Sequence, residues 1–299
     1  MSASGSIYDL GYQRYDGPRL GRLAVTRGLL RASLAAAYGI GRGGRAKIAP
    51  FTFAVLGLVP AVVAVGIVAL AAQAGAGEAI EEAGFISHAN YQGIVGTFVT
   101  LFLAAQAPEL FGRDQRYGTL PLFFSRLLTR TDYAMARLGG LVLAVLLVSL
   151  VPHLVLTVGA ALGAADPVAG LSEDAADIPR YIAITVVSSV LLSSVATVIA
   201  AWTPRRAYAT AGIIAAFLIP SVIVLIVSEL LPGDTAGFVV LASPSDVVDG
   251  LNAAIFGTVP DSPAVSSSGL PDWAFAAAAA VWIVALLAVI LRRYQTLDT

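Results

Sequence analysis

The chain of 299 residues contains no cysteine, only two histidines and little charge. The absence of cysteine excludes disulfide bonds, thiolate metal sites and a cysteine nucleophile. Asp, Glu, Lys and Arg together make up 12% of the residues, whereas they make up about a quarter of a soluble domain. Because 58% of the residues are apolar, the composition indicates an integral membrane protein.

Sequence motifs for nucleotide hydrolysis and for other catalysis are also absent. The single lysine, Lys47, does not follow a glycine-rich loop of the kind that binds nucleotide phosphates. The sequence contains no Gly-x-Ser-x-Gly elbow of a serine hydrolase and no His-Glu-x-x-His motif of a zinc protease. We therefore expect a chain that is not an enzyme, with no catalytic residue, no metal site and no cofactor bound by the chain itself.

Six apolar segments are each long enough to cross about 30 Å of hydrocarbon as a helix. The predicted spans are 50–72, 91–110, 137–163, 180–202, 208–231 and 271–291. Of the 18 Lys and Arg residues, all but Arg180 lie on one side of these spans. Because positive charge is retained in the cytoplasm, the sequence predicts an all-α membrane protein of six transmembrane helices with both termini cytoplasmic.

Residues 1–48 form a basic N-terminal segment without a span, and residues 49–299 form the six-span domain. Apolar residues that share one helical face in the first segment are Leu20, Leu23, Leu30, Leu34 and Tyr38. Arg27 interrupts this stripe. We interpret the segment as a helix at the cytoplasmic interface, attracted to anionic lipid, and a partly disordered basic leader is the alternative.

The outer segment between spans five and six contains the start signal of a short helix. Ser243 is placed to cap it, Pro244 to occupy its first turn, and Asp246 to complete a pair resembling a capping box. Gly257 is a typical helix end. A helix of this length cannot span a bilayer, so we expect it to re-enter the outer leaflet. Ser243, Pro244, Asp246 and Leu251 are therefore candidate residues of an extracellular gate.

Polar residues within the spans are few. Ser189, Ser193 and Thr197 share one face of span four, where they could line a translocation path or pack against a neighbouring helix. His153 is the one histidine in a span, and it is either a proton relay or a packed, hydrogen-bonded side chain. No carboxylate within the spans is its evident partner. His88 is predicted in an outer loop, without a visible role.

The cytoplasmic segment 111–136, between spans two and three, carries the most information. It continues a charged turn that begins at Glu109, and Gly118 permits a sharp bend there. A short apolar helix is predicted over 120–128, and Thr129 with Asp132 predicts a capping box. A charged turn held between two spans suits docking to a soluble partner, and an ordinary basic loop is the alternative.

The runs Gly118-Thr119-Leu120, Ser125-Arg126 and Thr129-Arg130, followed by Arg137, resemble the cytoplasmic loop of ABC-2-type transporter permeases. That family typically shows a charged stretch, Gly-Thr-Leu-Glu, an apolar run, Ser-Arg-Pro-Ile-Ser-Arg and a basic residue seven positions later. This chain differs at Pro121, where an acid is usual, and at Leu127, where proline is usual. The order of spans and the outer element resemble the same family.

This resemblance implies the permease subunit of an ATP-binding-cassette exporter in a bacterial plasma membrane. Separate ATPase subunits would bind ATP and Mg, and a second permease copy or a related permease would complete the transporter. The cargo would be a hydrophobic or amphipathic compound such as a drug, a lipid or a glycan precursor. The residues expected to contact the ATPase are Glu109, Arg113, Asp114, Arg116, Tyr117, Gly118 and Thr119.

Two other functions stay open from the residues alone. An ion-coupled carrier would use Glu109, Glu229 or His153 to hold the coupling ion. A membrane-embedded transferase or scaffold could bind a metal through the outer acids Asp234, Asp246, Asp249 and Asp261, although a solvated acidic rim is the better interpretation of their spacing. A nucleic-acid partner is not expected, since the basic residues are spread over four segments.

Overall fold

The computed structural model describes residues 17, 21–75, 87–124, 127–164, 166–230 and 234–297, and this part of the chain is helical without any strand. Six helices are long and apolar enough to cross a membrane. They are α2 (Arg45–Gln73), α4 (His88–Ala107), α7 (Arg130–Gly163), α9 (Asp177–Trp202), α10 (Arg206–Leu230) and α14 (Asp272–Gln295). The all-α class and the set of six membrane-length helices are confirmed.

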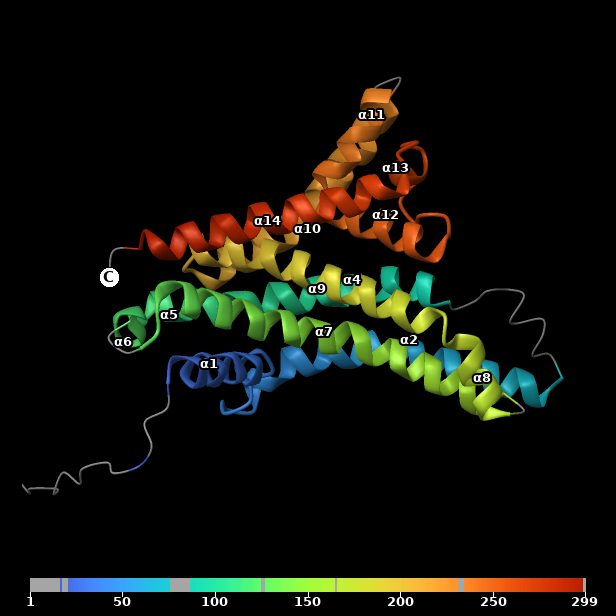
Figure 1. The fold of residues 1–299 in the computed structure, drawn as a ribbon, viewed down its shortest axis with the longest axis horizontal. Coiled ribbons are helices and arrows are strands. Elements are labelled where there is room, and N and C mark those ends of the chain that lie inside the picture. The colour runs from blue at the N-terminus through green and yellow to red at the C-terminus, as the bar shows by residue number, and fades with distance from the viewer. Residues whose placement is uncertain are drawn as a thin grey trace, which may run out of the picture.

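Shorter helices lie at the two ends of this bundle, apart from α11, which lies at the far end of α10 (Figure 1). They are α1 (Arg22–Ala37), a π-helical turn η1 (Pro108–Gly112), α5 (Arg113–Arg116), α6 (Leu120–Phe124), α8 (Pro167–Asp174), α11 (Asp234–Val239), a 3-10 turn η2 (Val240–Ala242), α12 (Pro244–Phe256) and α13 (Pro263–Ser266). We call the end with α1, α5 and α6 the basic end, after Arg22, Arg113 and Arg116. We call the end with α8, α12 and α13 the acidic end, after Asp174 and Asp249.

The helices extend past the predicted spans, most clearly at the basic end. Helix α7 begins at Arg130, ahead of the apolar span 137–163 and where Thr129 and Asp132 predict its cap: Thr129 Oγ1 accepts from the Asp132 N–H at 3.2 Å, and the Asp132 carboxylate accepts from the Thr129 N–H at 3.0 Å. The described part of segment 111–136 therefore contains α5, α6 and the first turns of α7, and the short helix predicted over 120–128 is observed over Leu120–Phe124. Hydropathy locates only the apolar part of a helix, whereas backbone hydrogen bonds continue through charged residues.

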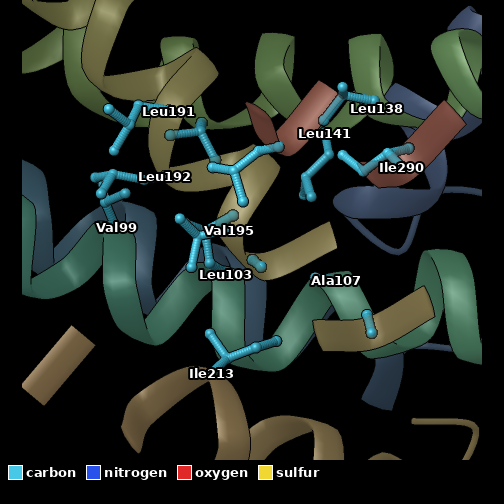
Figure 2. Packing of buried hydrophobic residues seen from close by; sticks show 14 of the residues in the cluster. Val99, Leu103, Ala107, Leu138, Leu141, Leu191, Leu192, Val195, Ile213 and Ile290 are labelled. Atoms are coloured by element: carbon cyan, nitrogen blue, oxygen red, sulfur yellow. The ribbon is translucent and has the colours of Figure 1, made fainter. Parts of the chain in front are cut away.

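Helix α9 lies in the middle of the core, as Figure 2 shows. Leu191, Leu192 and Val195 of this helix lie in one apolar cluster with residues of four other helices, namely Val99, Leu103, Leu141, Ile213 and Ile290. By contrast, α2 and α10 each leave one face of large apolar side chains exposed, for example Val63 and Ile223. Exposed apolar faces of this size are expected where helices contact lipid.

Helix α1 packs against α7 through small residues. Gly140 of α7 lies so close to α1 that a Cβ atom there would lie 2.9 Å from the Leu34 nitrogen and 3.0 Å from the Leu30 oxygen. The buried face of α1 is Leu29, Ser33 and Ala37. Of the predicted stripe, Leu30, Leu34 and Tyr38 are half-buried, Leu23 is exposed, and Leu20 lies outside the described residues. The stripe is thus only partly right, because close backbone contact selects small residues.

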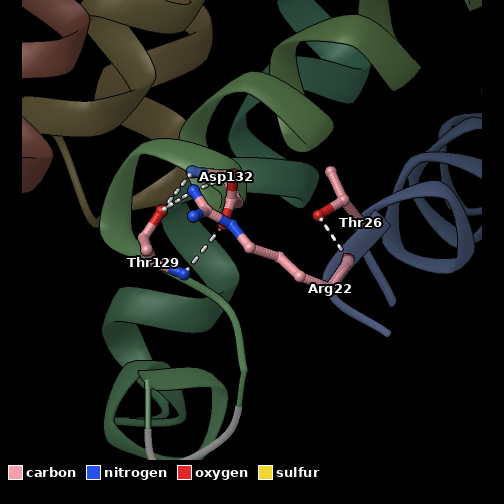
Figure 3. A network of polar contacts seen from close by, with 4 residues as sticks. All are labelled: Arg22, Thr26, Thr129 and Asp132. Atoms are coloured by element: carbon pink, nitrogen blue, oxygen red, sulfur yellow. Dashed lines mark hydrogen bonds and ion pairs between the residues drawn. The ribbon is translucent and has the colours of Figure 1, made fainter. Parts of the chain in front are cut away.

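An ion pair fixes the start of α1 on the start of α7 (Figure 3). Arg22 donates from Nε and Nη2 to the two oxygens of Asp132, at 2.7 and 2.9 Å. Its Nη2 also donates to Thr129 Oγ1 at 3.2 Å. A forked guanidinium–carboxylate contact of this kind sets orientation as well as strength, so the capping box of α7 is also the attachment point of α1.

Substitution of Gly140 by alanine tests the packing of α1 on α7. The added methyl group would press on the α1 backbone, and we expect the variant to unfold with a free energy lower by about 1–3 kcal/mol. The matched control is Gly163→Ala in the same helix, where the added Cβ has no neighbour within 4 Å. Thermal unfolding of both variants in lipid nanodiscs is the measurement, and equal midpoints for the two would contradict the packing described here.

Candidate functional site

The end of α4 continues into a bend at the basic end, residues 108–119. The π-helical turn η1 widens the helix over Pro108–Gly112, and such turns re-aim the side chains that follow. Gly112 lies against the α9–α10 connection, where a Cβ atom would lie 3.4 Å from the Pro204 oxygen. Gly118 ends the bend with φ +62°, as predicted for a sharp turn.

Glu109 binds two arginines from separate parts of the chain. Its Oε2 accepts from Arg42 Nη1 and its Oε1 accepts from Arg206 Nη1, both at 2.9 Å. The Glu109 side chain is only 16% exposed. Arg42 lies in the compact turn between α1 and α2, and Arg206 begins α10. One carboxylate therefore connects the end of the second membrane-length helix to the starts of the first and the fifth.

Asp114 makes the corresponding connection to α7. Its Oδ2 accepts from the Tyr133 hydroxyl at 2.5 Å and from Arg137 Nη2. The side chains of Asp114 and Arg137 are 14% and 10% exposed, so this ion pair is largely removed from water. The neighbouring Gln115 donates from Nε2 to the Ala201 carbonyl of α9 at 3.0 Å. The bend is thus bonded to α7 and α9 as well as to α10 and the α1–α2 turn.

The residues predicted to contact an ATPase fall into two groups. Glu109 and Asp114 face inward, and Thr119 is half-buried with its hydroxyl donating to the Asp114 backbone oxygen at 3.2 Å. The others are exposed, and we call them the docking patch: Arg113, Arg116, Tyr117 and Gly118. Ser125 and Arg126 of the same predicted motif lie outside the described residues.

The docking patch presents two cations around one aromatic ring. The guanidinium carbons of Arg113 and Arg116 lie 5.9 and 5.4 Å from the centroid of the Tyr117 ring. The Tyr117 side chain is 65% exposed. Arginine and tyrosine are the residue types that most often supply binding energy at protein interfaces. The exposed side of the bend thus carries residue types that are common at protein interfaces, while its other side is bonded to the bundle.

At the acidic end, α12 begins where the sequence predicts. Ser243 Oγ accepts from the Asp246 N–H at 3.3 Å, Pro244 lies in the first turn, and Gly257 ends the helix with φ +68°. The predicted capping-box pair is only half formed. The Ser243 N–H donates to the Val240 carbonyl at 3.2 Å, because the preceding 3-10 turn already offers that acceptor.

Helix α12 is attached to the bundle through polar contacts to α4 and α10. Asn252 Nδ2 donates to the Ala89 carbonyl at 2.9 Å. Ser243 Oγ lies 3.0 Å from Ser221 Oγ, and Ser245 Oγ donates to the Phe217 carbonyl at 3.4 Å. Leu251 is buried. The four predicted gate residues thus belong to one short helix that is held across the acidic end.

The interpretation of the outer acids as a solvated rim is wrong for two of them. Asp246 is buried, and the Asp249 carboxylate accepts from the Asp261 N–H at 3.2 Å and the Ser262 N–H at 2.9 Å. Asp261 is exposed, and the Asp234 side chain lies outside the described part. Among the described residues, no group of three His, Asp or Glu side chains is placed to hold a metal ion.

A cavity of about 460 Å³ lies beneath α12. Its wall is formed by residues of α4, α9, α10 and α12, including Gln92, Gly96, Thr100, Leu192, Phe217, Leu218, Val222 and Asn252. The predicted path residues Ser189, Ser193 and Thr197 are not part of this wall. They are fully buried in α9, and their hydroxyls have no hydrogen-bond partner among the described residues.

Sequence reasoning missed a buried polar cluster near the acidic end. His88 and His153 approach each other at 3.0 Å between their Nδ1 atoms, and His88 Nε2 lies 3.3 Å from the Asp174 carboxylate. His88 begins α4 instead of lying in a loop, and its carboxylate partner Asp174 lies in α8, outside the predicted spans. These residues are 65 and 86 positions apart, and only the packing of α4, α7 and α8 brings them together.

A scan against protein-family models and a search of curated proteins returned no match to this sequence. Function is therefore inferred from the bend, the cavity and the polar cluster, together with the loop resemblance.

Removal of the Arg137 guanidinium tests whether its ion pair with Asp114 attaches the bend to α7. Arg137→Met leaves Asp114 buried without its cation, and we expect a loss of about 3–5 kcal/mol in the free energy of unfolding. The matched control is Arg116→Met, which removes an exposed guanidinium from the same bend and should cost less than about 1 kcal/mol. Chemical unfolding in mild detergent measures both losses, and a similar effect of the two substitutions would argue against a buried ion pair.

Proposed function

We propose that this chain is the membrane permease subunit of an ATP-driven ABC exporter in a bacterial plasma membrane. It binds no nucleotide itself, and separate ATPase subunits hydrolyse ATP with Mg. A second copy of the chain or a related permease completes the transporter. The single observation that carries this proposal is the bend 108–119, which exposes the docking patch on one side and is bonded to four other parts of the bundle on the other.

The bend has the properties of a mechanical connection. A force on Tyr117 and its neighbouring arginines is passed to Glu109 and Asp114, which lie within the same short stretch. From there the ion pairs lead to Arg42, Arg206 and Arg137. Hydrogen bonds to charged groups contribute about 1.5–3 kcal/mol each, so movement of an ATPase against the docking patch displaces several membrane helices together.

The cavity beneath α12 supports a hydrophobic or amphipathic cargo. Its volume of about 460 Å³ lies within the usual range of small-molecule sites. Leu218 and Val222 of α10 line it and are more than half exposed, on a helix whose apolar face we expect to contact lipid. A compound dissolved in the bilayer therefore has a direct route to the cavity. The polar groups of Gln92 and Asn252 give the cavity a hydrogen-bonding side.

The orientation in the membrane follows from charge. The basic end is cytoplasmic by the positive-inside rule, so the docking patch faces the compartment that contains ATP. Helix α1 then lies at the inner interface with both termini in the cytoplasm, and α12 is a re-entrant helix that closes the outer end above the cavity.

An ion-coupled carrier is the second candidate, favoured by the buried pair His88–His153 with Asp174. The other candidate groups fit that function poorly, because Glu109 is paired with two arginines and Glu229 is exposed at the end of α10. Transport in vesicles that is driven by a proton gradient in the absence of ATP would favour the carrier over the exporter.

Replacement of both arginines of the docking patch tests the proposed function. Because Arg113 and Arg116 are exposed, Arg113→Ala/Arg116→Ala should leave the fold intact and weaken binding of an ATPase by about tenfold or more. The measurement is the amount of ATP-hydrolysing protein that co-purifies with the chain. Arg205→Ala is the matched control, since Arg205 also lies above an exposed ring, that of Tyr208, at 5.9 Å but outside the bend. Co-purification that is unchanged in the double variant, or no ATPase bound to the unaltered chain, would overturn the proposal.

A further inference from the structure

We propose that His88, His153 and Asp174 form a binding site for a single proton at the acidic end of the bundle. In this site the His88 imidazolium is paired with the Asp174 carboxylate and donates a hydrogen bond to a neutral His153. The existence of this site does not depend on the proposed exporter function, because none of its residues belongs to the bend.

The site is built from four elements and is closed to water on most sides. His88 begins α4, His153 lies in the second half of α7, Asp174 ends α8, and Tyr181 lies in the second turn of α9. Both histidines and Tyr181 are buried, while the Asp174 side chain is 17% exposed. Buried polar groups require hydrogen-bond partners, so the direction of each hydrogen bond in the site is constrained.

The direction of the hydrogen bonds can be followed inward from Ser188. Its hydroxyl donates to the Thr185 carbonyl at 3.2 Å, so its oxygen accepts from Gln92 Nε2, also at 3.2 Å. This places the Gln92 oxygen toward His153 Nε2, at 3.4 Å. Because an amide oxygen only accepts, His153 Nε2 carries a hydrogen. With that tautomer, a neutral His153 has a bare Nδ1, which accepts from His88 Nδ1–H at 3.0 Å.

The other nitrogen of His88 also faces acceptors. Its Nε2 lies 3.3 Å from the Asp174 carboxylate and 3.5 Å from Thr157 Oγ1. The Thr157 hydroxyl donates to the Tyr181 oxygen at 3.5 Å, which leaves the Thr157 oxygen to accept. His88 therefore needs a hydrogen on both ring nitrogens and is an imidazolium. The Asp174 carboxylate is the acceptor on this side of the ring, so the site holds one hydrogen more than two neutral imidazoles would carry.

The groups around the pair favour one positive charge there and not two. His153 faces His88 from α7, Asp174 from α8 and Tyr181 from α9, and Tyr91 of α4 contacts the His153 ring edge-on at 5.6 Å. Helix α2, which packs on α4 and α7, has no ionisable side chain after Lys47. The Tyr181 ring lies parallel to the His153 ring, 5.1 Å away, and its centroid lies 4.8 Å from that of His88. An aromatic face at this distance stabilises a single cation, and one carboxylate neutralises it.

The proton connects two parts of the molecule. While it is bound, Asp174 attaches α8 to α4; without it, the carboxylate faces the lone pair of His88 Nε2, which is unfavourable in a buried position. The same chain of hydrogen bonds ends at Gln92, whose side chain lines the cavity. Release of the proton therefore alters both the attachment of α8 and the polar side of the cavity.

Nitrogen NMR of the full chain in lipid bilayers tests this proposal directly. The chain has only two histidines, so labelling histidine with ¹⁵N gives four ring signals. At about pH 7 we expect three of the four ring nitrogens to carry a hydrogen, as detected by the one-bond N–H coupling. Assignment comes from His153→Gln, which leaves only the signals of His88.

Two substitutions show whether the carboxylate holds the proton. Asp174→Asn should leave one hydrogen on each ring, so two of the four nitrogens are then bare. The matched control is Asp177→Asn, an acid close in sequence that is paired with Arg180 at 2.7 Å, and it should keep three protonated nitrogens. Two or four protonated nitrogens in the unaltered chain, or three retained after Asp174→Asn, would overturn the proposal. The spectrum of the unaltered chain decides the matter even if the Asp174 variant fails to fold.

Discussion

The largely buried carboxylates of Glu109 and Asp114 hold the bend after the second membrane-length helix against the rest of the bundle. Each is paired with arginine from a different helix or turn, and loss of one partner from the largely buried pair of Asp114 and Arg137 costs several kcal/mol. The bend, the α1–α2 turn, α7 and α10 are therefore constrained to move together or not at all. Because of this constraint, the exposed docking patch is connected through the bend to the membrane helices.

The two ends of the bundle have complementary roles in the proposed exporter. The basic end presents arginine and tyrosine side chains that suit a protein partner, whereas the acidic end is closed by α12 above a largely apolar cavity. Helix α9 lies between them and is the most buried of the six membrane-length helices, and α4, α7, α10 and α14 all pack against it. The proton site at the acidic end adds a chemical input next to the cavity, separate from the docking patch.

Features that depend on neighbouring residues were predictable from the sequence, and features that depend on helix packing were not. Thr129 with Asp132, and Ser243 with Pro244, signal helix starts within four residues, and both starts are where the sequence places them. The partners of Glu109 and of His88 lie 67 and 65 positions away, and no pattern in one sequence says which helices are adjacent. The inward position of Glu109 was missed for this reason, since a charged turn read alone suggests solvent exposure.

The central claim is that the bend touches a cytoplasmic ATPase, and photo-crosslinking in living cells tests it most directly. A photoreactive amino acid at position 117 replaces an exposed side chain, and one at position 259, whose valine is 80% exposed between α12 and α13, serves as the control at the acidic end. The account predicts an adduct with an ATP-hydrolysing protein from position 117 and none from position 259. Adducts with lipid alone at position 117, or the same ATPase adduct from position 259, would contradict it.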